Sequence, residues 1–179
     1  MVEVKKFLHL GCGLKTIKST DNIKITNLDI LELQGVDIVA PAFPLKINDG
    51  TFDIVYAAHL LEHYSKRMVH EVLLEWNRVL KRNGLLRLSV PNFAVLAEIY
   101  IRYKRLDLMN PIIGGQTSFY DYHFSIFDEE ILTDLMKKSG LTAIHPWKPE
   151  RVFHGDIWDF SQAETMGYKI SLNLEGRKK

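Results

Sequence analysis

The chain has 179 residues and a formal net charge of +1, with 23 Lys and Arg residues against 22 Asp and Glu residues. This near balance provides no bulk attraction to nucleic acid or to an anionic membrane surface. A chain of this length buries a substantial core, so we expect a single domain over residues 1–179. Cys12 is the only cysteine, which excludes an internal disulfide framework and a cysteine-rich metal site and favours the reducing cytoplasm.

The first residues superficially resemble an export signal, because Lys5 and Lys6 precede an apolar stretch and Cys12. That stretch is only Phe7-Leu8-His9-Leu10, whereas the core of a signal needs about 7–15 apolar residues. No apolar run approaches the ~20 residues that span a bilayer. We therefore expect neither an export signal nor a contact with the membrane.

Short β-rich runs alternate with amphipathic stretches along the chain, which is typical of an α/β domain with a mainly parallel sheet. Strands are expected over residues 7–10, 23–28, 36–39, 52–57, 85–90, 142–145 and 168–174. Helices are expected over residues 65–80, 93–106 and 129–139, where apolar positions recur at helical spacing. Asn83-Gly84 is expected to end the first helix and Asp128 to cap the third.

The segment near residues 107–126 is aperiodic and rich in Gly, Asn and aromatic residues, so it is expected to be an irregular insertion. Loops of this length are more often functional or disordered than idle. Its side chains Gln116, Tyr120, Tyr122 and His123 offer stacking surfaces and polar groups for a sugar or an aromatic ligand. A small satellite core beneath the loop is the alternative.

Gly11 and Gly13 directly follow the first expected strand, and Asp29 follows the second. Ligands of open parallel sheets bind beyond the carboxyl ends of the strands, where glycines allow the backbone to approach a ligand closely. A carboxylate at the second strand can accept hydrogen bonds from both hydroxyls of a ribose. A dinucleotide site would favour a third glycine where Thr16 stands, so a single nucleoside-like ligand is favoured over a dinucleotide. A plain turn without a ligand is the alternative.

Five segments in this order resemble the motifs of class I S-adenosylmethionine-dependent methyltransferases, and in particular the small bacterial methyltransferase type 11-like group. The segments are FLHLGCG, NLDI, DGTFDIVYAAHLLEHY, EWNRVLKRNGLLRLSVPN and FDEEILTDLMKKSGL. The resemblance implies a Rossmann-like methyltransferase fold, with a seven-stranded, mostly parallel sheet whose last strand is antiparallel. It also implies that S-adenosylmethionine is the cofactor, and that residues 107–126 cover the acceptor side.

The resemblance further assigns a cofactor-binding role to positions that match the family's motifs. Gly11 and Gly13 would line the methionine part, Asp29 would hold the ribose, Pro41 and Ala42 would border the adenine, and Ala58 and His59 would pass near the sulfonium. His9, Cys12 and Ile30 complete the expected cofactor set, with Cys12 contributing its backbone N–H to the turn.

Three features depart from the family pattern. His9 stands where an acid is usual, and Pro41 stands where many relatives carry an acid that reaches the adenine amino group. Only sixteen positions separate Gly13 from Asp29, so the first crossover helix is expected to be shortened or replaced by a turn. If His9 contacts the cofactor, its protonation would tune binding between pH 5 and 8.

Methyl transfer from a sulfonium needs alignment, exclusion of water and, for an oxygen acceptor, removal of a proton. His59 and His63 flank Glu62 at a spacing that puts both imidazoles on one helix face. His63 is the first candidate for the base, followed by His59 and His123, and plain packing or capping is the alternative for His63. The pair would also suit a metal ion, but no third ligand is evident in the sequence, so no metal is expected.

A last aromatic region precedes the final expected strand and contains Trp147, His154, Asp156 and Trp158. This region would either close over the acceptor or form an interface, because Trp is favoured in both settings.

The resemblance therefore implies a methyltransferase that uses S-adenosylmethionine on a small-molecule or carbohydrate-precursor acceptor. The alternatives are an inactive S-adenosylmethionine-binding or scaffold protein of the same fold and, with less support, a nucleotide-dependent oxidoreductase. Nucleic acid is not an expected partner, since charge is nearly balanced and no target-recognition domain is evident. The sequence makes no prediction about the oligomeric state.

Overall fold

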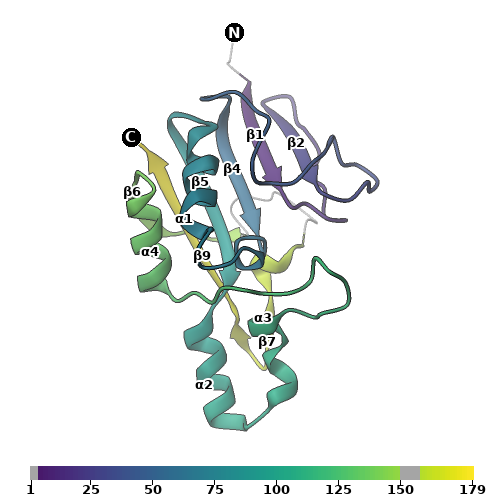
Figure 1. Ribbon diagram of the computed structural model, residues 1–179, viewed down its shortest axis with the longest axis vertical. Helices are drawn as coiled ribbons and strands as arrows, with labels where there is room; N and C mark the ends of the chain where they lie inside the picture. The colour runs from purple at the N-terminus through teal and green to yellow at the C-terminus, as the bar shows by residue number, and fades with distance from the viewer. Residues whose placement is uncertain (1–3, 150–157) are drawn as a thin grey trace.

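A computed structural model describes residues 4–149 and 158–179 of the chain. Nine strands are present in these ranges: β1 (Lys5–Leu10), β2 (Ile23–Asp29), β3 (Ile38–Val39), β4 (Phe52–Ala58), β5 (Leu80–Pro91), β6 (Leu141–Pro146), β7 (Glu164–Thr165), β8 (Tyr168–Lys169) and β9 (Ser171–Lys178). Seven of them form one sheet in the order β3-β2-β1-β4-β5-β9-β6, while β7 and β8 pair separately (Figure 1). Within the seven-stranded sheet of the described residues, β9 alone runs antiparallel to its neighbours, β5 and β6, which confirms the expected sheet.

The helices of the described residues all follow β4. They are α1 (Val69–Arg78), α2 (Phe93–Tyr103), the short α3 (Asn110–Ile113) and α4 (Glu129–Lys138), with 3₁₀ turns η1 (Leu61–His63), η2 (Leu106–Met109) and η4 (Phe160–Gln162). Helices α1 and α4 lie on one face of the sheet, where Trp76 and Met136 join the main core (Figure 1). Each large apolar side chain that is fully buried there stabilises the fold by about 1.5–3 kcal/mol.

Among the described residues, the link between β1 and β2 and the residue Trp147 cover the opposite face of β1 and β4. Ile17, from the turn-rich link between β1 and β2, packs with Trp147 against Phe7 and Tyr56. The side chain of Asn27 in β2 fixes this link, because its Oδ1 accepts from the Ile17 N–H at 2.9 Å and its Nδ2 donates to the Ile17 carbonyl at 3.0 Å. The expected loss of the first crossover helix is confirmed, and the next two links are also free of helix in this part of the chain.

The expected end of the first helix at Asn83-Gly84 is wrong. Helix α1 ends at Arg78, and β5 already begins at Leu80. Asn83 has a positive φ of 63° and lies where the register with β4 shifts, between the pairs made by Leu80 and by Leu85. The Asn-Gly pair thus forms an irregularity inside the strand, because pairing with β4 starts before it.

The expected irregular segment begins with regular structure. Two short helical turns, η2 and α3, occupy its first part, with Pro111 in the first turn of α3, a position that proline tolerates well. Residues 114–124 then form the loop proper. The expected N-cap of α4 is confirmed, since the Asp128 carboxylate accepts from the Ile131 N–H at 2.8 Å.

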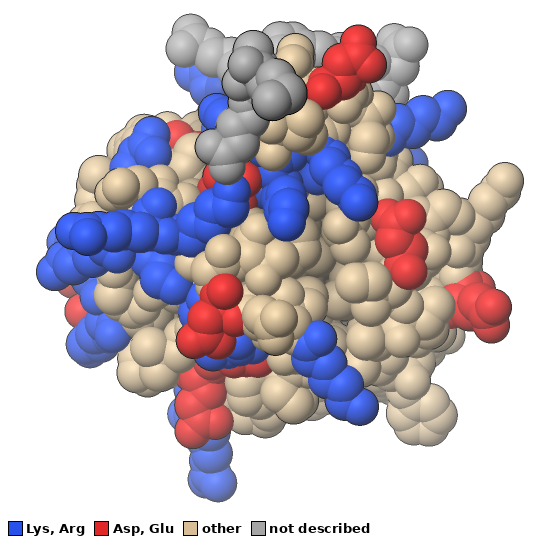
Figure 2. Space-filling model, turned by 90° about the horizontal axis from the view of Figure 1, so that it is seen from above, with Lys and Arg blue, Asp and Glu red and all other residues tan. Residues whose placement is uncertain are grey.

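Lys and Arg side chains gather on one side of the end of the molecule that carries the amino ends of β1 and β4 (Figure 2). The carboxyl ends of these strands, where ligands are expected, lie at the other end of the sheet (Figure 1). This basic surface is therefore separate from the candidate site. Within residues 4–149 and 158–179, no helix combines the length and apolar character that crossing a bilayer requires.

Candidate active site

The turn after β1 is built on two glycines in the left-handed backbone region. Gly11 has φ 61° and Gly13 has φ 50°, and a Cβ added to Gly11 would lie 2.8 Å from Leu60 Cδ1. Asp29 holds the turn, because one carboxylate oxygen accepts from the Gly13 N–H at 2.7 Å and the other accepts from the Leu31 N–H at 2.9 Å. Each oxygen keeps a further lone pair that a ligand hydroxyl can use.

Three cavities meet around this turn and the end of β4. The Asp29 cavity, of about 390 Å³, is lined by Gly11, Gly13, Asp29, Ile30, Pro41 and Ala42, with Tyr120 and Tyr122 opposite. The His123 cavity, of about 520 Å³, is lined by His123, Pro111, Asp121, Trp158 and Phe160. The His9 cavity, of about 320 Å³, is lined by His9, Cys12, Lys15, Ala58 and Asp159. His59 lines all three cavities, and His63 lines the first two.

His59 ends β4 in a left-handed conformation, with φ 49°, which is uncommon for a residue with a side chain. Its Nε2 lies 2.8 Å from the Ser171 hydroxyl, and that hydroxyl donates to the Phe160 carbonyl at 2.6 Å. The Ser171 oxygen therefore accepts from Nε2–H, so the neutral ring carries its proton on Nε2. Burial lowers the pKa of His59 to about 3.

His63 and His123 face each other edge to face, with ring centroids 4.6 Å apart. His63 Nδ1 donates to the Tyr122 carbonyl at 3.0 Å, and His123 Nδ1 donates to the Pro111 carbonyl at 2.9 Å. A carbonyl can only accept, so the proton of each neutral ring lies on Nδ1 and the lone pair on Nε2. Burial lowers the pKa of both rings, while hydrogen bonding to the Tyr122 and His59 backbone raises that of His63.

Glu62 lies between these histidines and is fully buried. Neither carboxylate oxygen accepts a hydrogen bond from a described residue, and the nearest basic atom is Nδ1 of His59, 3.4 Å from Oε1. Burial raises the pKa of Glu62 to about 8. The sequence showed Glu62 only as the residue between two candidate bases, because its isolation depends on packing that no local pattern reports.

The C-terminal end of the loop of residues 114–124 is hydrogen-bonded to the segment after β4. Both the Phe124 and Ser125 N–H groups donate to the Glu62 carbonyl, at 2.8 and 3.2 Å, and the Ser125 hydroxyl donates to the Tyr64 carbonyl at 2.7 Å. These bonds bring His123 beside His63. Tyr120 and Tyr122, expected on the acceptor side, line the Asp29 cavity. Gln116 lines none of the three cavities, and its Nε2 contacts the Ile113 carbonyl at 3.4 Å.

His9 is buried in the sheet at the edge of its cavity, with only 2% of its surface exposed. Its ring lies 5.1 Å from that of Tyr56, and its Nδ1 contacts the Asn27 side chain at 3.3 Å. Burial lowers the pKa of His9 to about 4, so the imidazole stays neutral between pH 5 and 8. The expected titration in that range is therefore not supported. Asp159, which the sequence did not single out, also lines this cavity and accepts from the Tyr56 hydroxyl at 2.5 Å.

Cys12 is buried in the glycine turn, where its N–H donates to the Leu28 carbonyl at 3.1 Å. Burial raises the pKa of its thiol to about 12. Such a thiol is not a reactive nucleophile at neutral pH. Its geometry is that of a small residue in a turn, as the sequence suggested.

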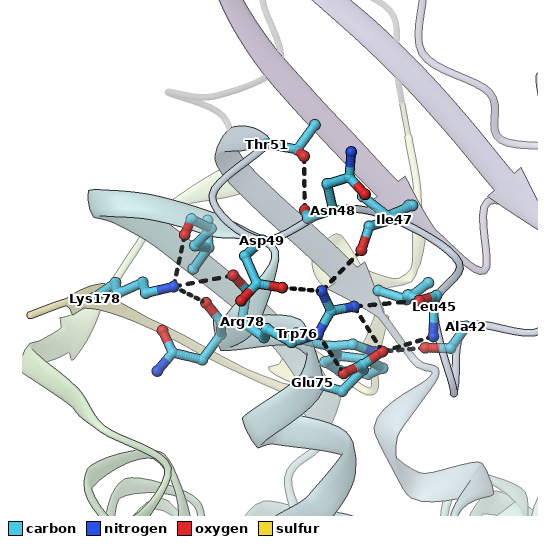
Figure 3. Close-up of polar contacts among 12 residues, drawn as sticks. Ala42, Leu45, Ile47, Asn48, Asp49, Thr51, Glu75, Trp76, Arg78 and Lys178 are labelled. Carbon is cyan, nitrogen blue, oxygen red and sulfur yellow. Dashed lines mark hydrogen bonds and ion pairs between the residues drawn. The ribbon is translucent and has the colours of Figure 1, made fainter.

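A polar network supports the Pro41–Ala42 side of the Asp29 cavity (Figure 3). The Trp76 Nε1–H donates to the Ala42 carbonyl at 2.8 Å, and the Leu45 N–H donates to Glu75 at 2.8 Å. Arg78 donates to Glu75 and to the carbonyls of Leu45 and Ile47, which ties the segment after β3 to α1. Sequence reasoning missed this network, because its members lie about 30 positions apart.

The last aromatic region divides between two places. Trp158 lines the His123 cavity, with its ring centroid 5.7 Å from that of Phe160. Trp147 packs with Ile17 against Phe7 and Tyr56, and its Nε1–H donates to the Leu88 carbonyl at 3.0 Å. His154 and Asp156 lie outside the described residues.

The strand order, the antiparallel β9 and the glycine turn facing Asp29 together define a Rossmann-like methyltransferase fold. Residues 8–88 match the family model described as a methyltransferase domain. This match and the fold support a class I S-adenosylmethionine-dependent methyltransferase, so the resemblance seen in the sequence is confirmed. A search of curated proteins found no significant sequence match.

Solved structures share the fold at low sequence identity. A Thermotoga maritima S-adenosylmethionine-dependent methyltransferase, described as a possible histamine N-methyltransferase, is 21% identical, with a TM-score of 0.59. The match covers 100% of this chain and 84% of the Thermotoga maritima chain. An Archaeoglobus fulgidus methyltransferase is 16% identical, with 99% and 87% covered and a TM-score of 0.61. The Burkholderia thailandensis 1,6-didemethyltoxoflavin-N1-methyltransferase, solved with its substrate and S-adenosylhomocysteine bound, is 13% identical, with 98% and 72% covered and a TM-score of 0.59.

Proposed function

We propose that the chain binds S-adenosylmethionine in the Asp29 cavity and transfers its methyl group to a small-molecule or carbohydrate-precursor acceptor in the His123 cavity. The observation that carries this proposal is the wall that the two cavities share, since His59 and His63 line both. A donor in the Asp29 cavity and an acceptor in the His123 cavity would both lie next to His59 and His63, and their reacting atoms would meet at the end of β4. In-line displacement needs such an arrangement, because the two reacting atoms must approach to about 3–3.5 Å.

The residues of the Asp29 cavity fit the parts of the cofactor. Asp29 has lone pairs left for the ribose hydroxyls, and Gly13, where an added Cβ would meet nothing within 4 Å, leaves room for the methionine part. Pro41 and Ala42 offer an apolar edge for the adenine. The bound S-adenosylhomocysteine of the Burkholderia thailandensis enzyme supports the same choice of cofactor.

The cofactor supplies an activated methyl group, so the chain itself has to orient the acceptor, exclude water and handle a proton. His63 is the proposed base for an oxygen acceptor, with His59 and His123 beside it. Because Nδ1 of His63 donates to the Tyr122 carbonyl, only Nε2 can take the proton. An acceptor that is already nucleophilic would need only the alignment.

The His123 cavity favours a small acceptor with a ring that can stack. Trp158 and Phe160 offer aromatic surface, and Asp121 together with the histidines offers polar contacts. The Thermotoga maritima and Burkholderia thailandensis neighbours are described as acting on small molecules, which supports this class over nucleic acid. A cytoplasmic location stays a prediction from the single cysteine.

Calorimetry with S-adenosylmethionine tests the cofactor site. Wild-type protein is expected to bind one cofactor, and Asp29→Ala is expected to weaken binding by at least about tenfold, because the ribose loses its acceptor and the glycine turn loses its anchor. Asp21→Ala, a change at an exposed acid, is the matched control. Absence of binding at millimolar cofactor would rule the proposal out.

A methyl-release assay over sugar and aromatic acceptors then tests turnover. If His63→Gln lowers the activity of chelator-treated protein, His63 is supported as the base, whereas unchanged activity across the pH range would remove it from that role. Cofactor binding without turnover on any acceptor would instead favour a binding protein that lacks catalysis.

A further inference from the structure

Glu62 poses a problem that the methyltransferase role leaves open. A buried carboxylate is costly unless it is paired or hydrogen-bonded. Glu62 is fully buried, and its two oxygens accept no hydrogen bond from the described residues. His59 is no partner for an ionised Glu62, because its proton lies on Nε2 and the Nδ1 that faces Glu62 carries a lone pair, which can only accept from the protonated carboxyl. A cation between Glu62 and its neighbours would resolve this arrangement.

The hydrogen bonds of His63 and His123 leave each ring with a free lone pair that can bind such a cation. In each ring the Nδ1–H donates to a backbone carbonyl, of Tyr122 and of Pro111 respectively, so that Nε2 carries the lone pair. Histidines that bind metal ions typically make this second hydrogen bond, which fixes the tautomer and orients the ring. Both carbonyls belong to the segment that runs from α3 into the loop of residues 114–124, so the fold of this loop sets up both ligands.

The distances suit a single ion. One ligand atom from each of Glu62, His63 and His123 lies within 4.8 Å of the other two. Around a tetrahedral ion with bonds near 2.05 Å, ligand atoms lie about 3.3 Å apart, so the three side chains would draw closer together to bind one ion. Asp121 lines the same cavity and adds a carboxylate near the three groups.

We propose that Glu62, His63 and His123 bind one divalent transition-metal ion, best matched by Zn²⁺, at the wall of the His123 cavity. Two imidazoles and one carboxylate suit zinc and other transition metals better than Mg²⁺ or Ca²⁺, which prefer oxygen ligands. Three protein ligands leave one position for water or for an oxygen of the acceptor. The sequence offered only His59 and His63 as a pair, and the fold replaces His59 by Glu62 and His123.

The ion would change the role of His63. Nε2 of His63 cannot bind a metal ion and accept a proton from the acceptor at once, so the metal site and the base are exclusive assignments. In the metal-bound protein, the ion would hold the acceptor oxygen beside the wall shared with the Asp29 cavity. The metal proposal does not depend on methyl transfer, because the ion can be titrated in the absence of cofactor and acceptor.

Titration of tag-free, chelator-treated protein tests the site. We expect one Zn²⁺ per chain by calorimetry and by metal analysis, and Co²⁺ is expected to give the visible absorption of a four-coordinate site. Glu62→Gln and His123→Gln should each weaken Zn²⁺ binding by at least about tenfold, the lower end of what even the outer-shell partners of metal ligands contribute. His70→Gln changes a histidine on α1 that lines none of the three cavities, so it should bind like wild type.

Thermal unfolding gives a second measurement. Zn²⁺ should raise the melting temperature of wild type and of His70→Gln, but not that of Glu62→Gln, since only a folded site gains from the ion. If Glu62→Gln does not fold, the same comparison with His123→Gln decides. Less than one-tenth of an equivalent of bound Zn²⁺, or equal affinity in His123→Gln, would overturn the proposal. S-adenosylmethionine binding measured on the same samples separates this outcome from a failure of the cofactor site.

Discussion

His9 is a buried imidazole two residues before the glycine turn, in a position whose partners come from three other segments. Asn27 of β2 contacts its Nδ1, the ring of Tyr56 of β4 packs against it at a tilt of 30°, and the charges of Asp159 and Asp29 oppose the effect of burial. Burial dominates and lowers the pKa to about 4. The structural effect of His9 on pH dependence therefore concerns the stability of the fold.

Acid should destabilise the fold through His9. In the unfolded chain the imidazole takes up a proton near pH 6.5, whereas in the folded chain it does so only near pH 4. The unfolded state thus binds more protons between these values, so stability is complete above pH 6.5 and falls as pH drops toward 4. From pH 7 to pH 5 the loss that His9 causes is expected to be about 2 kcal/mol.

His9→Asn, whose amide can still donate to Asn27, should remove this part of the pH dependence. Urea unfolding of wild type and variant at pH 7 and pH 5 measures it, with His70→Gln as the control. The same slope in wild type and His9→Asn would contradict the prediction.

Individual site residues differ in how far the sequence could place them. Gly11, Gly13 and Asp29 could be brought together from the sequence, because each directly follows a strand of a parallel sheet. Tyr120 and Tyr122 could be recognised as ligand-facing residues but not assigned to a cavity, since their side depends on the path of a loop. The isolation of Glu62 could not be predicted, because it depends on how side chains distant in sequence pack.

At the scale of elements, α1 supports the Asp29 cavity although it lines none of it. Arg78 in its last turn binds Glu75, Asp49 and the backbone carbonyls of Leu45 and Ile47 (Figure 3). These contacts fix the path of the segment that follows Pro41 and Ala42. The helix thereby anchors the link between β3 and β4, whose described residues contain no helix.

Arg78→Ala should loosen this segment. We expect a loss of about 2–3 kcal/mol in the free energy of unfolding, because several hydrogen bonds to a charged group disappear together. We also expect a weaker affinity for S-adenosylmethionine. Denaturant unfolding and calorimetry measure the two effects. Arg105→Ala, which breaks the exposed pair with Asp107, is the control and should change neither; an Arg78→Ala protein with wild-type stability would contradict the assignment.

Element boundaries were predicted well where a local signal decides them and poorly where pairing decides them. Asp128 caps α4 as expected, since an N-cap depends on a few neighbouring residues. Asn83-Gly84 looked like a helix end, yet β5 begins before it because Leu80 already pairs with Phe52 of β4. Turn residues inside a strand can only be recognised when the partner strand is known.

At the scale of the whole molecule, the last strand completes an element formed much earlier in the chain. Lys178 of β9 donates to the carbonyls of Asn77, Arg78 and Leu80 at 2.8, 3.0 and 2.8 Å (Figure 3). These are carbonyls at and just beyond the end of α1, which the helix itself leaves without partners. The order of strands could not follow from their spacing in the sequence, because such contacts span about 100 positions.

Lys178→Met tests this contact, since methionine keeps most of the apolar stem and removes the ammonium group. The free energy of unfolding should fall by about 1–2 kcal/mol, with an unchanged dependence on denaturant. Lys179→Met, at an exposed neighbouring position, should match wild type. Equal stability of the two variants would show that the Lys178 contacts contribute nothing.

The place of β9 also bears on the order in which the molecule forms. Strand β6 reaches the sheet only through β9, and β9 comes after it in the chain. During folding, β6 can therefore join the sheet only after β9, which contains the last residues of the chain, has paired with β5. The helix α4, which precedes β6, depends on the same step for its final packing. Strand β9 pairs with β5 between residues as far apart in sequence as Leu85 and Arg177, and pairings over such separations form slowly. We therefore expect this edge to be the last part of the sheet to acquire protection from hydrogen exchange.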